Sequence, residues 1–427
     1  MPDQHQRPQR PQHPHPDEEQ HLVQLLRGRR LLRTLVGRAR RPDGGFGWLS
    51  DDGHLLADRG VHLWVSARMT HVAALGVLEG DATCEELADH GIEALVPGGL
   101  LHDREWGGWF ASVRADGTPA VTDKRAYEHA FVVLAAASAL TAGRPGADAL
   151  LDEALHVFDQ GFWGDHDGLA ADSWDRTWTT LEDYRGANAN MHSVEALLAA
   201  WDVTRDPRWL GHALRTVERL VHEVARAWAF RLPEHYTPDW QPLPDYHRDR
   251  PADPFRPYGV TPGHLLEWAR LCLHVRHALG AEAPGWLLEN ARSLFDVGVQ
   301  DGWHVDGEDG FVYTTDFDGR PVVRDRLHWV LAEAICAART LHLATGDPTY
   351  AEWYDRWWQH AHDRFVDDDG SWRHELGPDL TPSSTVWTGR PDVYHAYQAS
   401  LVGALGPMVS FAGALRDRRR KAVDVSR

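Results

Sequence analysis

Short turn segments containing glycine, aspartate and an apolar or aromatic residue recur along the whole chain, and this repeat constrains the fold more than any other feature. The segments are Asp43-Gly-Gly-Phe46, Gly107-Gly-Trp109, Asp167-Gly-Leu169, Asp309-Gly-Phe311 and Asp369-Gly-Ser-Trp372. Their glycines are roughly 60 residues apart, except for one step of about twice that length. Second turn signals such as Asp116-Gly117 follow several of them, which is typical of β-hairpins. The chain is therefore predicted to consist of repeated units, with one repeat concealed near its middle.

Between these turns lie stretches rich in alanine and leucine whose apolar residues recur at helical spacing. The predicted helices are Val65 to Leu78, Arg125 to Leu140, Ala149 to Phe158, Met191 to Trp201, Trp209 to Ala227, His264 to Leu279, Trp286 to Val297, His328 to Leu343, Thr349 to Phe365 and Tyr394 to Gly413. Two helices and a hairpin at this period favour a closed ring of helical hairpins, an all-α barrel, whose loops collect a pocket at one end. An open helical solenoid is the alternative, because a period alone does not show closure.

The two ends of the chain differ in composition from the part between them. Residues 1–20 are rich in Gln, His, Pro and Arg and lack the hydrophobic segment of a secretory signal, so they are predicted to be a disordered tail. Residues 21–416 are predicted to form a single barrel domain, and residues 417–427 a charged C-terminal tail. Nowhere do about 18 apolar residues follow one another, so no membrane span is expected.

Charge, cysteine and tryptophan content narrow the class of ligand. The chain has 44 Lys and Arg against 63 Asp and Glu, a net charge of −19, which argues against nucleic-acid or membrane partners and favours a small uncharged ligand. Cys84, Cys272 and Cys336 have no paired spacing, so disulfides are not expected and a cytoplasmic location fits best. Many of the 20 tryptophans stand beside Gly, Asp or His, as in sugar-binding clefts, although core packing explains most of them.

Two histidines are placed where a turn enters a predicted helix. A Pro-Gly turn precedes His264, which falls in the first turn of its helix. Glu267 is three residues further along the same helical face and is expected to orient the imidazole. His395 stands at the start of the last helical stretch in a similar position. Two histidines at the N-terminal ends of predicted helices indicate an enzyme that transfers protons.

Three further helices carry polar candidates for the pocket. Arg68 lies in an otherwise apolar helix, where a lone buried charge is costly, so it is expected to face a polar cavity. Tyr127 is in similar surroundings, and its hydroxyl either meets a ligand oxygen or is satisfied in the core. Asn188 and His192 are four residues apart on one face, although Asn188 or Asn190 would serve equally well as a helix cap.

One more predicted helix contributes Trp329 and Glu333, which are also four residues apart. A carboxylate among Leu, Ala and Ile is either a functional group or part of a buried structural pair. Most of the 27 histidines are expected to be surface or core residues. The histidines assigned to structural roles are His129, His274, His342, His360 and His362.

A metal site is the main alternative for the His–Glu pairs. His192 with Glu195, and His264 with Glu267, could each supply two ligands. This spacing is weakly specific, and no His-Glu-x-x-His or Asp-rich motif occurs. No catalytic metal is therefore expected.

Taken together, the segments resemble the N-acylglucosamine 2-epimerase superfamily, most closely its aldose–ketose isomerase branch of the D-mannose isomerase and sulfoquinovose isomerase type. The shared motifs are Leu-Trp-x-x-Ala-Arg-Met-Thr-His, Asn-x-Asn-Met-His-x-x-Glu-Ala, Pro-Gly-His-x-x-Glu-Trp, Trp-x-x-x-Glu-Ala and Asp-x-Tyr-His-Ala-x-Gln. They occur in the same order as in that branch, and the resemblance covers about Arg33 to Leu415. It implies an (α/α)6 barrel and proton transfer on a reducing sugar without a cofactor.

The resemblance also implies a role for each matching residue. His264 corresponds to the base that works at C1 and C2 of the sugar, and His395 to a second acid/base histidine. The matches that line the family's pocket are Arg68, Tyr127, Asn188, His192, Arg256, Glu267, Trp329 and Glu333. Among them, Arg68 is suited to polarise the carbonyl and stabilise the enediolate oxygen.

The activity implied is isomerisation of D-mannose to D-fructose through a cis-enediol, with D-lyxose as a second substrate. A sugar 2-epimerase is the first alternative. Epimerisation needs two bases on opposite faces of C2, and His264 and His395 are compatible with that requirement. A sulfosugar isomerase needs a cation for the sulfonate, for which Arg256 or Arg185 is available. An inverting glycoside hydrolase would use two carboxylates, and a sugar-binding protein would never exchange the C2 proton. The carboxylates considered for hydrolysis are Asp103, Glu105, Glu333 and Asp392.

Overall fold

The computed structural model describes residues 16–425 of the chain. Residues 1–15 of the predicted N-terminal tail and the last two residues of the predicted C-terminal tail lie outside this range. The described range begins with helix α1 (Pro16–Leu31), which already includes residues 16–20. It ends with helix α14 (Phe411–Val425), so the charged segment after residue 416 continues a helix.

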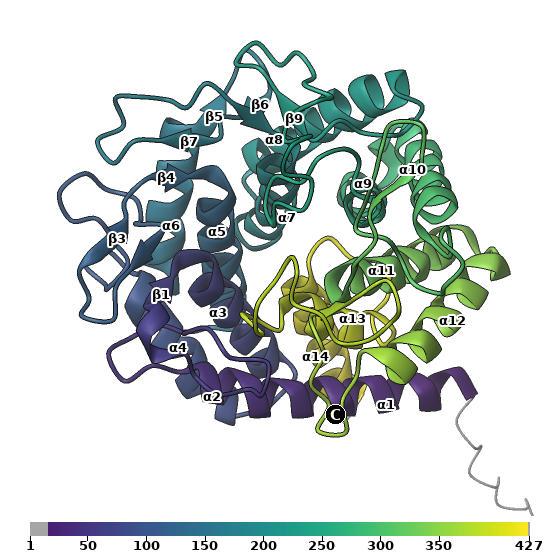
Figure 1. The fold of residues 1–427 in the computed structure, drawn as a ribbon. Helices are drawn as coiled ribbons and strands as arrows, with labels where there is room; N and C mark the ends of the chain where they lie inside the picture. Colours follow the sequence, from purple (N-terminus) through teal and green to yellow (C-terminus); the bar gives the residue numbers. More distant parts are fainter. Residues whose placement is uncertain (1–15, 426–427) are drawn as a thin grey trace, which may run out of the picture.

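Six helices form a closed inner ring, as Figure 1 shows. In chain order they are α3 (Leu63–Leu78), α5 (Ala126–Thr141), α7 (Ala187–Thr204), α9 (Pro262–Leu279), α11 (His328–Thr345) and α13 (Tyr394–Val402). Each packs against the next one, and α13 packs against α3, so the ring has no open end. The closure confirms the predicted (α/α)6 barrel and excludes the open solenoid.

An outer layer of helices covers the ring. It consists of α4 (Thr83–Leu95), α6 (Ala147–Val157), α8 (Pro207–Val217), α10 (Trp286–Gly302) and α12 (Pro348–Arg364). Each packs against the inner helix before it in the chain, whereas the inner helix α13 is covered by α1. The sixth hairpin of the barrel is therefore assembled from the two ends of the chain. The last helix, α14, packs against α3, α5 and α7.

Burial explains why the two layers differ in sequence. Every residue of α3 is buried, and its run of Val, Ala, Leu and Met needs no polar face. The outer helix α4 buries Cys84, Ala88 and Ile92 but exposes Glu85 and Glu86, which is the stripe pattern of a helix with one solvent face. The sequence analysis missed α4, and it merged α13 and α14 into one helix.

Short helical segments connect these elements. They are η1 (Leu32–Val36), α2 (Gly37–Ala39), η2 (Ala57–Arg59), η3 (Phe158–Phe162), η4 (Glu218–Ala225) and η5 (Gly280–Glu282). Within residues 16–425, no helix is long and apolar enough to cross a membrane.

Two-residue strands stand at the entrance to most inner helices. The antiparallel pairs at these entrances are β1 (Val61–His62) with β2 (Ser112–Val113), β4 (Lys124–Arg125) with β7 (Ser173–Trp174), β8 (Arg185–Gly186) with β9 (His235–Tyr236), and β12 (Arg326–Leu327) with β13 (Glu375–Leu376). Single antiparallel bridges, Val260 with Thr315 and Leu49 with Arg390, take the same place before α9 and α13. These pairings fix the first turns of all six inner helices at one end of the barrel.

The remaining strands complete short hairpins. They are β3 (Pro119–Val121), which pairs with β2, and the pairs β5 (Trp163–Gly164) with β6 (Leu169–Ala170) and β10 (Thr314–Thr315) with β11 (Pro321–Val323).

Glycine is required directly before two of the entrance pairings. Gly60 has φ 72° and Gly259 has φ 94°, in the left-handed region that favours glycine. A Cβ atom on Gly60 would collide with the carbonyl oxygen of Val113, and one on Gly259 with that of Thr315. The two paired strands can approach so closely only because neither glycine has a side chain.

Candidate active site

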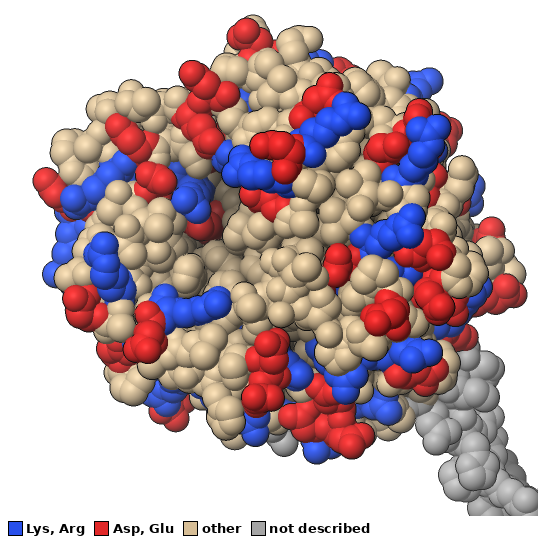
Figure 2. All heavy atoms as spheres, viewed as in Figure 1, with Lys and Arg blue, Asp and Glu red and all other residues tan. Residues whose placement is uncertain are grey.

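A pocket opens at the centre of the ring, at the end where the inner helices begin. Figure 2 shows this side of the molecule, with a hollowed, largely uncharged centre and the charged side chains gathered around it. The predicted site residues that line the pocket are Arg68, Tyr127, Asn188, His192, His264, Glu267, Trp329 and His395. All six inner helices contribute at least one of them. The positive ends of six helix dipoles therefore converge on the pocket, which favours an anionic ligand or intermediate there.

His264 is held by a carboxylate that the sequence analysis did not identify. Its Nδ1–H donates to Oε1 of Glu234 at 2.8 Å, and both side chains are buried. The expectation that Glu267 orients His264 is therefore wrong, because Glu267 lies instead beside His192 and Arg270. With Nδ1 committed to Glu234, Nε2 is the nitrogen of His264 that can accept a proton.

His395 forms a second imidazole–carboxylate pair with Glu333. Its Nδ1 is 2.8 Å from Oε1 of Glu333, which is fully buried beneath the pocket. Burial lowers the pKa of His395 below its ordinary value, although the hydrogen bond and charge of Glu333 oppose this shift. His395 is therefore neutral at pH 7 and, like His264, offers Nε2 as a base.

The indole of Trp329 lies between the two histidines. Its ring centre is 5.1 Å from that of His264 and 5.7 Å from that of His395. The indole therefore separates the two imidazoles. It takes no part in proton transfer itself, because it has no basic atom. The pocket thus presents two proton acceptors around one flat apolar face, an arrangement suited to a pyranose ring.

The floor of the pocket is a buried cluster of carboxylates around Arg270. The guanidinium of Arg270 is 2.9 Å from Glu333, 3.3 Å from Glu267 and 3.6 Å from Glu195. Burial by itself would raise the pKa of Glu333, but the charge of Arg270 and the hydrogen bond from His395 outweigh it and lower that pKa to about 2. Arg270 thus keeps ionised the carboxylate that holds His395.

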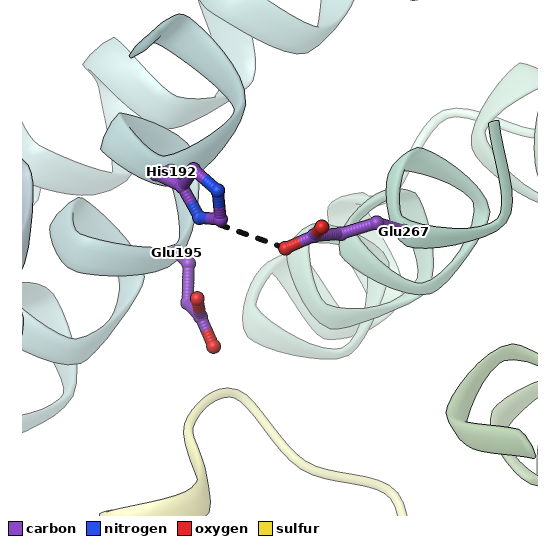
Figure 3. A group of neighbouring side chains, drawn as sticks. All are labelled: His192, Glu195 and Glu267. Carbon is purple, nitrogen blue, oxygen red and sulfur yellow. Dashed lines mark ion pairs between the residues drawn. The ribbon is translucent and has the colours of Figure 1, made fainter. Parts of the chain in front are cut away.

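The third pocket histidine, His192, faces the same floor. Figure 3 shows His192 and Glu195 on one helix, with Glu267 reaching towards them from another; Nδ1 of His192 is 3.6 Å from Oε1 of Glu267. Burial, together with the charge of Arg68, lowers the pKa of His192 well below its ordinary value. Burial and the repulsion of Glu333 raise the pKa of Glu267 well above its own. His192 is therefore neutral at pH 7.

Arg68 is the cation that faces the pocket. Its Nη1 donates to Oδ2 of Asp392 at 3.1 Å, and its Nη2 donates to the hydroxyl of Tyr127 at 3.0 Å. Burial would lower the pKa of Arg68, but Tyr127 and Asp392 raise it, so the guanidinium stays charged. Burial also raises the pKa of Tyr127 to about 12, which keeps its hydroxyl protonated. Arg68 and Tyr127 thus form a fixed donor pair on the wall opposite α9 and α11.

The two asparagines at the start of α7 have different roles. The amide of Asn190 bonds the backbone of Ala170 and the carbonyl of Gly186, so this side chain is structural. Asn188 lines the pocket, and its buried Oδ1 has no hydrogen-bond partner among the described residues. Neither side chain caps the helix.

Arg256 lies in a second pocket beside the central one. Its guanidinium makes a bidentate pair with Glu182, at 2.7 and 2.8 Å, and bonds Asp172 at 3.0 Å. The two pockets share Tyr127, Asn188 and Phe255 in their walls. Arg256 is thus adjacent to the site but already neutralised by two carboxylates.

Aromatic side chains form the rim above the histidines. The ring of Phe255 lies 5.2 Å from that of Trp387 and 6.0 Å from that of Trp64. Phe255 is 39% exposed although it lines the pocket, so it borders the opening. These rings narrow the entrance and offer flat apolar surface to a sugar.

The predicted metal alternative is tested by the same cluster. The ligand atoms of His192, Glu195 and Glu267 lie within 4.8 Å of one another, as do those of Glu267, Glu333 and His395. Both sets surround Arg270, whose guanidinium pairs with all three carboxylates. A divalent cation here would have to sit beside a fixed positive charge. The cluster is therefore better suited to Arg270 than to a metal.

Several pocket residues were not identified from the sequence. They are His328 and His374, which line the pocket, and Glu234 and Arg270, which hold side chains around it; Asp392 was considered only as a hydrolytic carboxylate. A signal did exist for two of them: the carbonyl oxygens of Glu234 and His374 accept from the first amides of α7 and α11, as that of Asp172 does for α5. These are equivalent positions of the repeat. Aligning the repeats on their helix entrances would have placed these side chains at the pocket.

A closed ring of helical hairpins with ionisable side chains converging on its mouth defines the class of (α/α)6-barrel enzymes. The family model described as N-acylglucosamine 2-epimerase (GlcNAc 2-epimerase) matches residues 44–399. The chain therefore belongs to the N-acylglucosamine 2-epimerase family, and it is an isomerase.

Individual relatives agree with this assignment. The D-mannose isomerase of Thermobifida fusca is 53% identical over 388 residues, covering 90% of this chain and 95% of that protein. The D-mannose isomerase of Pseudomonas cannabina pv. alisalensis is 48% identical over 92% of this chain and 95% of its own. A crystal structure of a D-mannose isomerase superposes with a TM-score of 0.83 at 29% identity, covering 92% of this chain and 99% of that one.

The pairing of His264 with Glu234 leads to a first prediction. Glu234→Gln removes the charge that holds the imidazole, and kcat is expected to fall on the order of 10- to 100-fold, a part of what a positioned acid–base group contributes. Glu218→Gln, an exposed change in the preceding segment η4, is the matched control and should leave kcat unchanged. Steady-state kinetics on both variants, with thermal unfolding as a check of the fold, would decide; wild-type kcat in Glu234→Gln would contradict the assignment.

Proposed function

We propose that the protein interconverts D-mannose and D-fructose, with D-lyxose and D-xylulose as a second pair. The observation that carries this proposal is the identity of 53% and 48% to two D-mannose isomerases over nearly the whole chain. The pocket supports it, because its aromatic rim and the polar side chains placed around it suit a monosaccharide.

The proposed chemistry uses groups already placed around the pocket. A histidine–carboxylate pair takes the proton of the anomeric hydroxyl and, as the imidazolium so formed, returns it to the ring oxygen, so the pyranose opens to the aldehyde. Nε2 of His264 then removes the C2 proton. Arg68 and Tyr127 donate to the carbonyl oxygen, which stabilises the enediolate as its charge develops. Return of that proton to C1, together with transfer of the O2 proton to O1, gives the ketose: the C2–H and O2–H bonds break and the C1–H and O1–H bonds form, so no external redox partner is needed.

A 2-epimerase remains the second candidate because of one feature of the site. Two imidazole–carboxylate pairs, His264 with Glu234 and His395 with Glu333, flank Trp329. If each base reached C2 from its own face, the enediolate would be reprotonated to the epimer. The products distinguish the two reactions, since an epimerase makes D-glucose from D-mannose and an isomerase makes D-fructose.

The sulfosugar and hydrolase alternatives fit the pocket less well. Arg256, the candidate for a sulfonate, is neutralised by Glu182 and Asp172. Asp103, considered as a hydrolytic carboxylate, is bound by Lys124 and Arg176 instead of lining the central pocket. The carboxylates that do approach the pocket are paired with its histidines and arginines.

A single experiment tests the reaction and the absence of a metal requirement together. The purified protein, treated with a chelator and desalted, is incubated with D-mannose in deuterated water and followed by NMR. We expect D-fructose to form at the rate of untreated enzyme, because Arg270 fills the electrostatic role a cation would have. D-Glucose deuterated at C2 would establish the epimerase, and activity restored only by an added divalent ion would contradict the metal-free proposal.

We also propose that the protein acts in the cytoplasm. Cys84, Cys272 and Cys336 are buried and form no disulfide in the described chain, as suits a reducing compartment. Its monosaccharide substrate would reach it there as a free sugar.

A further inference from the structure

His328 is a buried pocket residue for which the proposed chemistry has no use. It is the first residue of α11, directly before Trp329, and it lines the pocket while being only 5% exposed. Its backbone N–H donates to the carbonyl oxygen of His374 at 3.0 Å, and its ring Nδ1 is 3.3 Å from the same oxygen. The helix entrance therefore fixes both the backbone and the ring of His328.

The contacts of the ring determine which nitrogen carries its proton. A carbonyl oxygen only accepts hydrogen bonds, so Nδ1 of His328 must be the protonated nitrogen. Burial lowers the pKa of His328 to about 3, so the ring is neutral at pH 7. A neutral ring protonated at Nδ1 has a lone pair at Nε2. That Nε2 is buried and has no hydrogen-bond partner among the described residues.

The plane of the imidazole is fixed as well. The ring of His374 stacks on it with a centroid distance of 3.8 Å and an interplanar angle of 24°. Burial and the neighbouring His328 lower the pKa of His374 well below its ordinary value, so the two stacked rings do not repel each other as cations. Nε2 of His328 is thus an oriented acceptor, and leaving it unpaired when a ligand closes the pocket would weaken binding.

We propose that His328 is a substrate-binding residue whose Nε2 accepts a hydrogen bond from one hydroxyl group of the bound sugar. The proposal rests on the proposed function, since it needs a polyhydroxyl substrate in this pocket. The partner must be a donor, so it is a hydroxyl and not the carbonyl oxygen that Arg68 and Tyr127 address. His328 therefore selects among sugars by the position of a hydroxyl, whereas His264 and His395 carry the reaction.

Deoxy sugars identify that hydroxyl. His328→Phe keeps a ring that can stack on His374 but removes the acceptor, and kcat/KM for D-mannose is expected to fall about 5- to 100-fold. The same comparison is made with 3-, 4- and 6-deoxy-D-mannose. For one analogue, which lacks the hydroxyl that His328 binds, wild type and variant should have equal kcat/KM. A loss of the same size with every analogue, or no loss with D-mannose, would overturn the proposal.

Two further variants separate binding from folding. His328→Gln restores an acceptor oxygen and should recover part of the lost kcat/KM, whereas a merely structural role would give no selective recovery. His342→Phe, on the same helix but outside the pocket, is the matched control and should change none of the ratios. If wild type converts no D-mannose to ketose, the proposed function fails first, and this proposal with it. Wild-type turnover with an unaffected His328→Phe variant refutes the role of His328 alone.

Discussion

His264→Gln is expected to lower kcat for D-mannose isomerisation by about 10²- to 10⁴-fold with little change in thermal stability. A positioned general base contributes that much to a proton transfer, and the buried Glu234 fixes His264 for this task through Nδ1 at 2.8 Å. Glutamine is close to histidine in reach but has no basic atom, so the C2 proton has no acceptor. The measurement is kcat together with the rate at which C2-deuterated D-mannose exchanges its label with water.

The control for this variant lies on the same helix. His277→Gln changes an exposed histidine at the far end of α9, away from the pocket, and should retain wild-type kcat. Loss of label exchange in His264→Gln, together with retained binding of D-mannose, would show that the base itself was removed. A variant that still exchanges the C2 label at the wild-type rate would exclude His264 as the base.

His395→Gln is expected to lower kcat as much as His264→Gln does. The pH profile of the wild-type enzyme should show the reason. Burial lowers the pKa of His395 below 6.5, so the imidazole remains an unprotonated base at pH values where an exposed histidine is already charged. Activity should therefore persist as the pH falls through 6.5 and decline only below it. The profile of kcat/KM against pH measures the midpoint of that acid limb.

Glu333→Gln tests the direction of this shift. The charge of Glu333 raises the pKa of His395 and partly offsets burial, so removing it should move the acid limb to still lower pH. Because Glu333 also pairs with Arg270, the variant needs a thermal unfolding control, and breaking such a buried pair costs about 3–5 kcal/mol. An acid limb that moves to higher pH would contradict the assignment of His395, as would full activity in His395→Gln.

The fold was accessible from the sequence because the repeat and the helix period are properties of single segments. Buried inner helices such as α3 and α5 carry continuous apolar runs that are hard to miss. Helix α4 was overlooked because its apolar residues form a stripe between acidic ones and carry little weight in a window average. The break between α13 and α14 was missed although Gly406-Pro407, a dipeptide that ends helices, stands within it.

A site residue could be predicted only where the sequence of its own helix indicates its position. His264, His395 and Arg68 stand near the starts of inner helices, and the ring brings them to one pocket. Their partners are different, because Glu234 is thirty positions from His264 and meets it only through the pairing of β8 with β9. Spacing along one helix suggested Glu267 instead. Which carboxylate serves which histidine is a property of the closed barrel and not of any single segment.

The sixth hairpin also determines at which point of its synthesis the chain can complete the active site. Among the described helices α1 leaves the ribosome first, yet it packs on α13, which is made after the other five inner helices. At ordinary rates of synthesis the two are separated by on the order of 20 to 70 s. During that time the growing chain has five hairpins, an uncovered seam and no His395. Catalysis must therefore wait until the last inner helix has been made, and a nascent chain stalled before it would hold a partly built pocket without its second base.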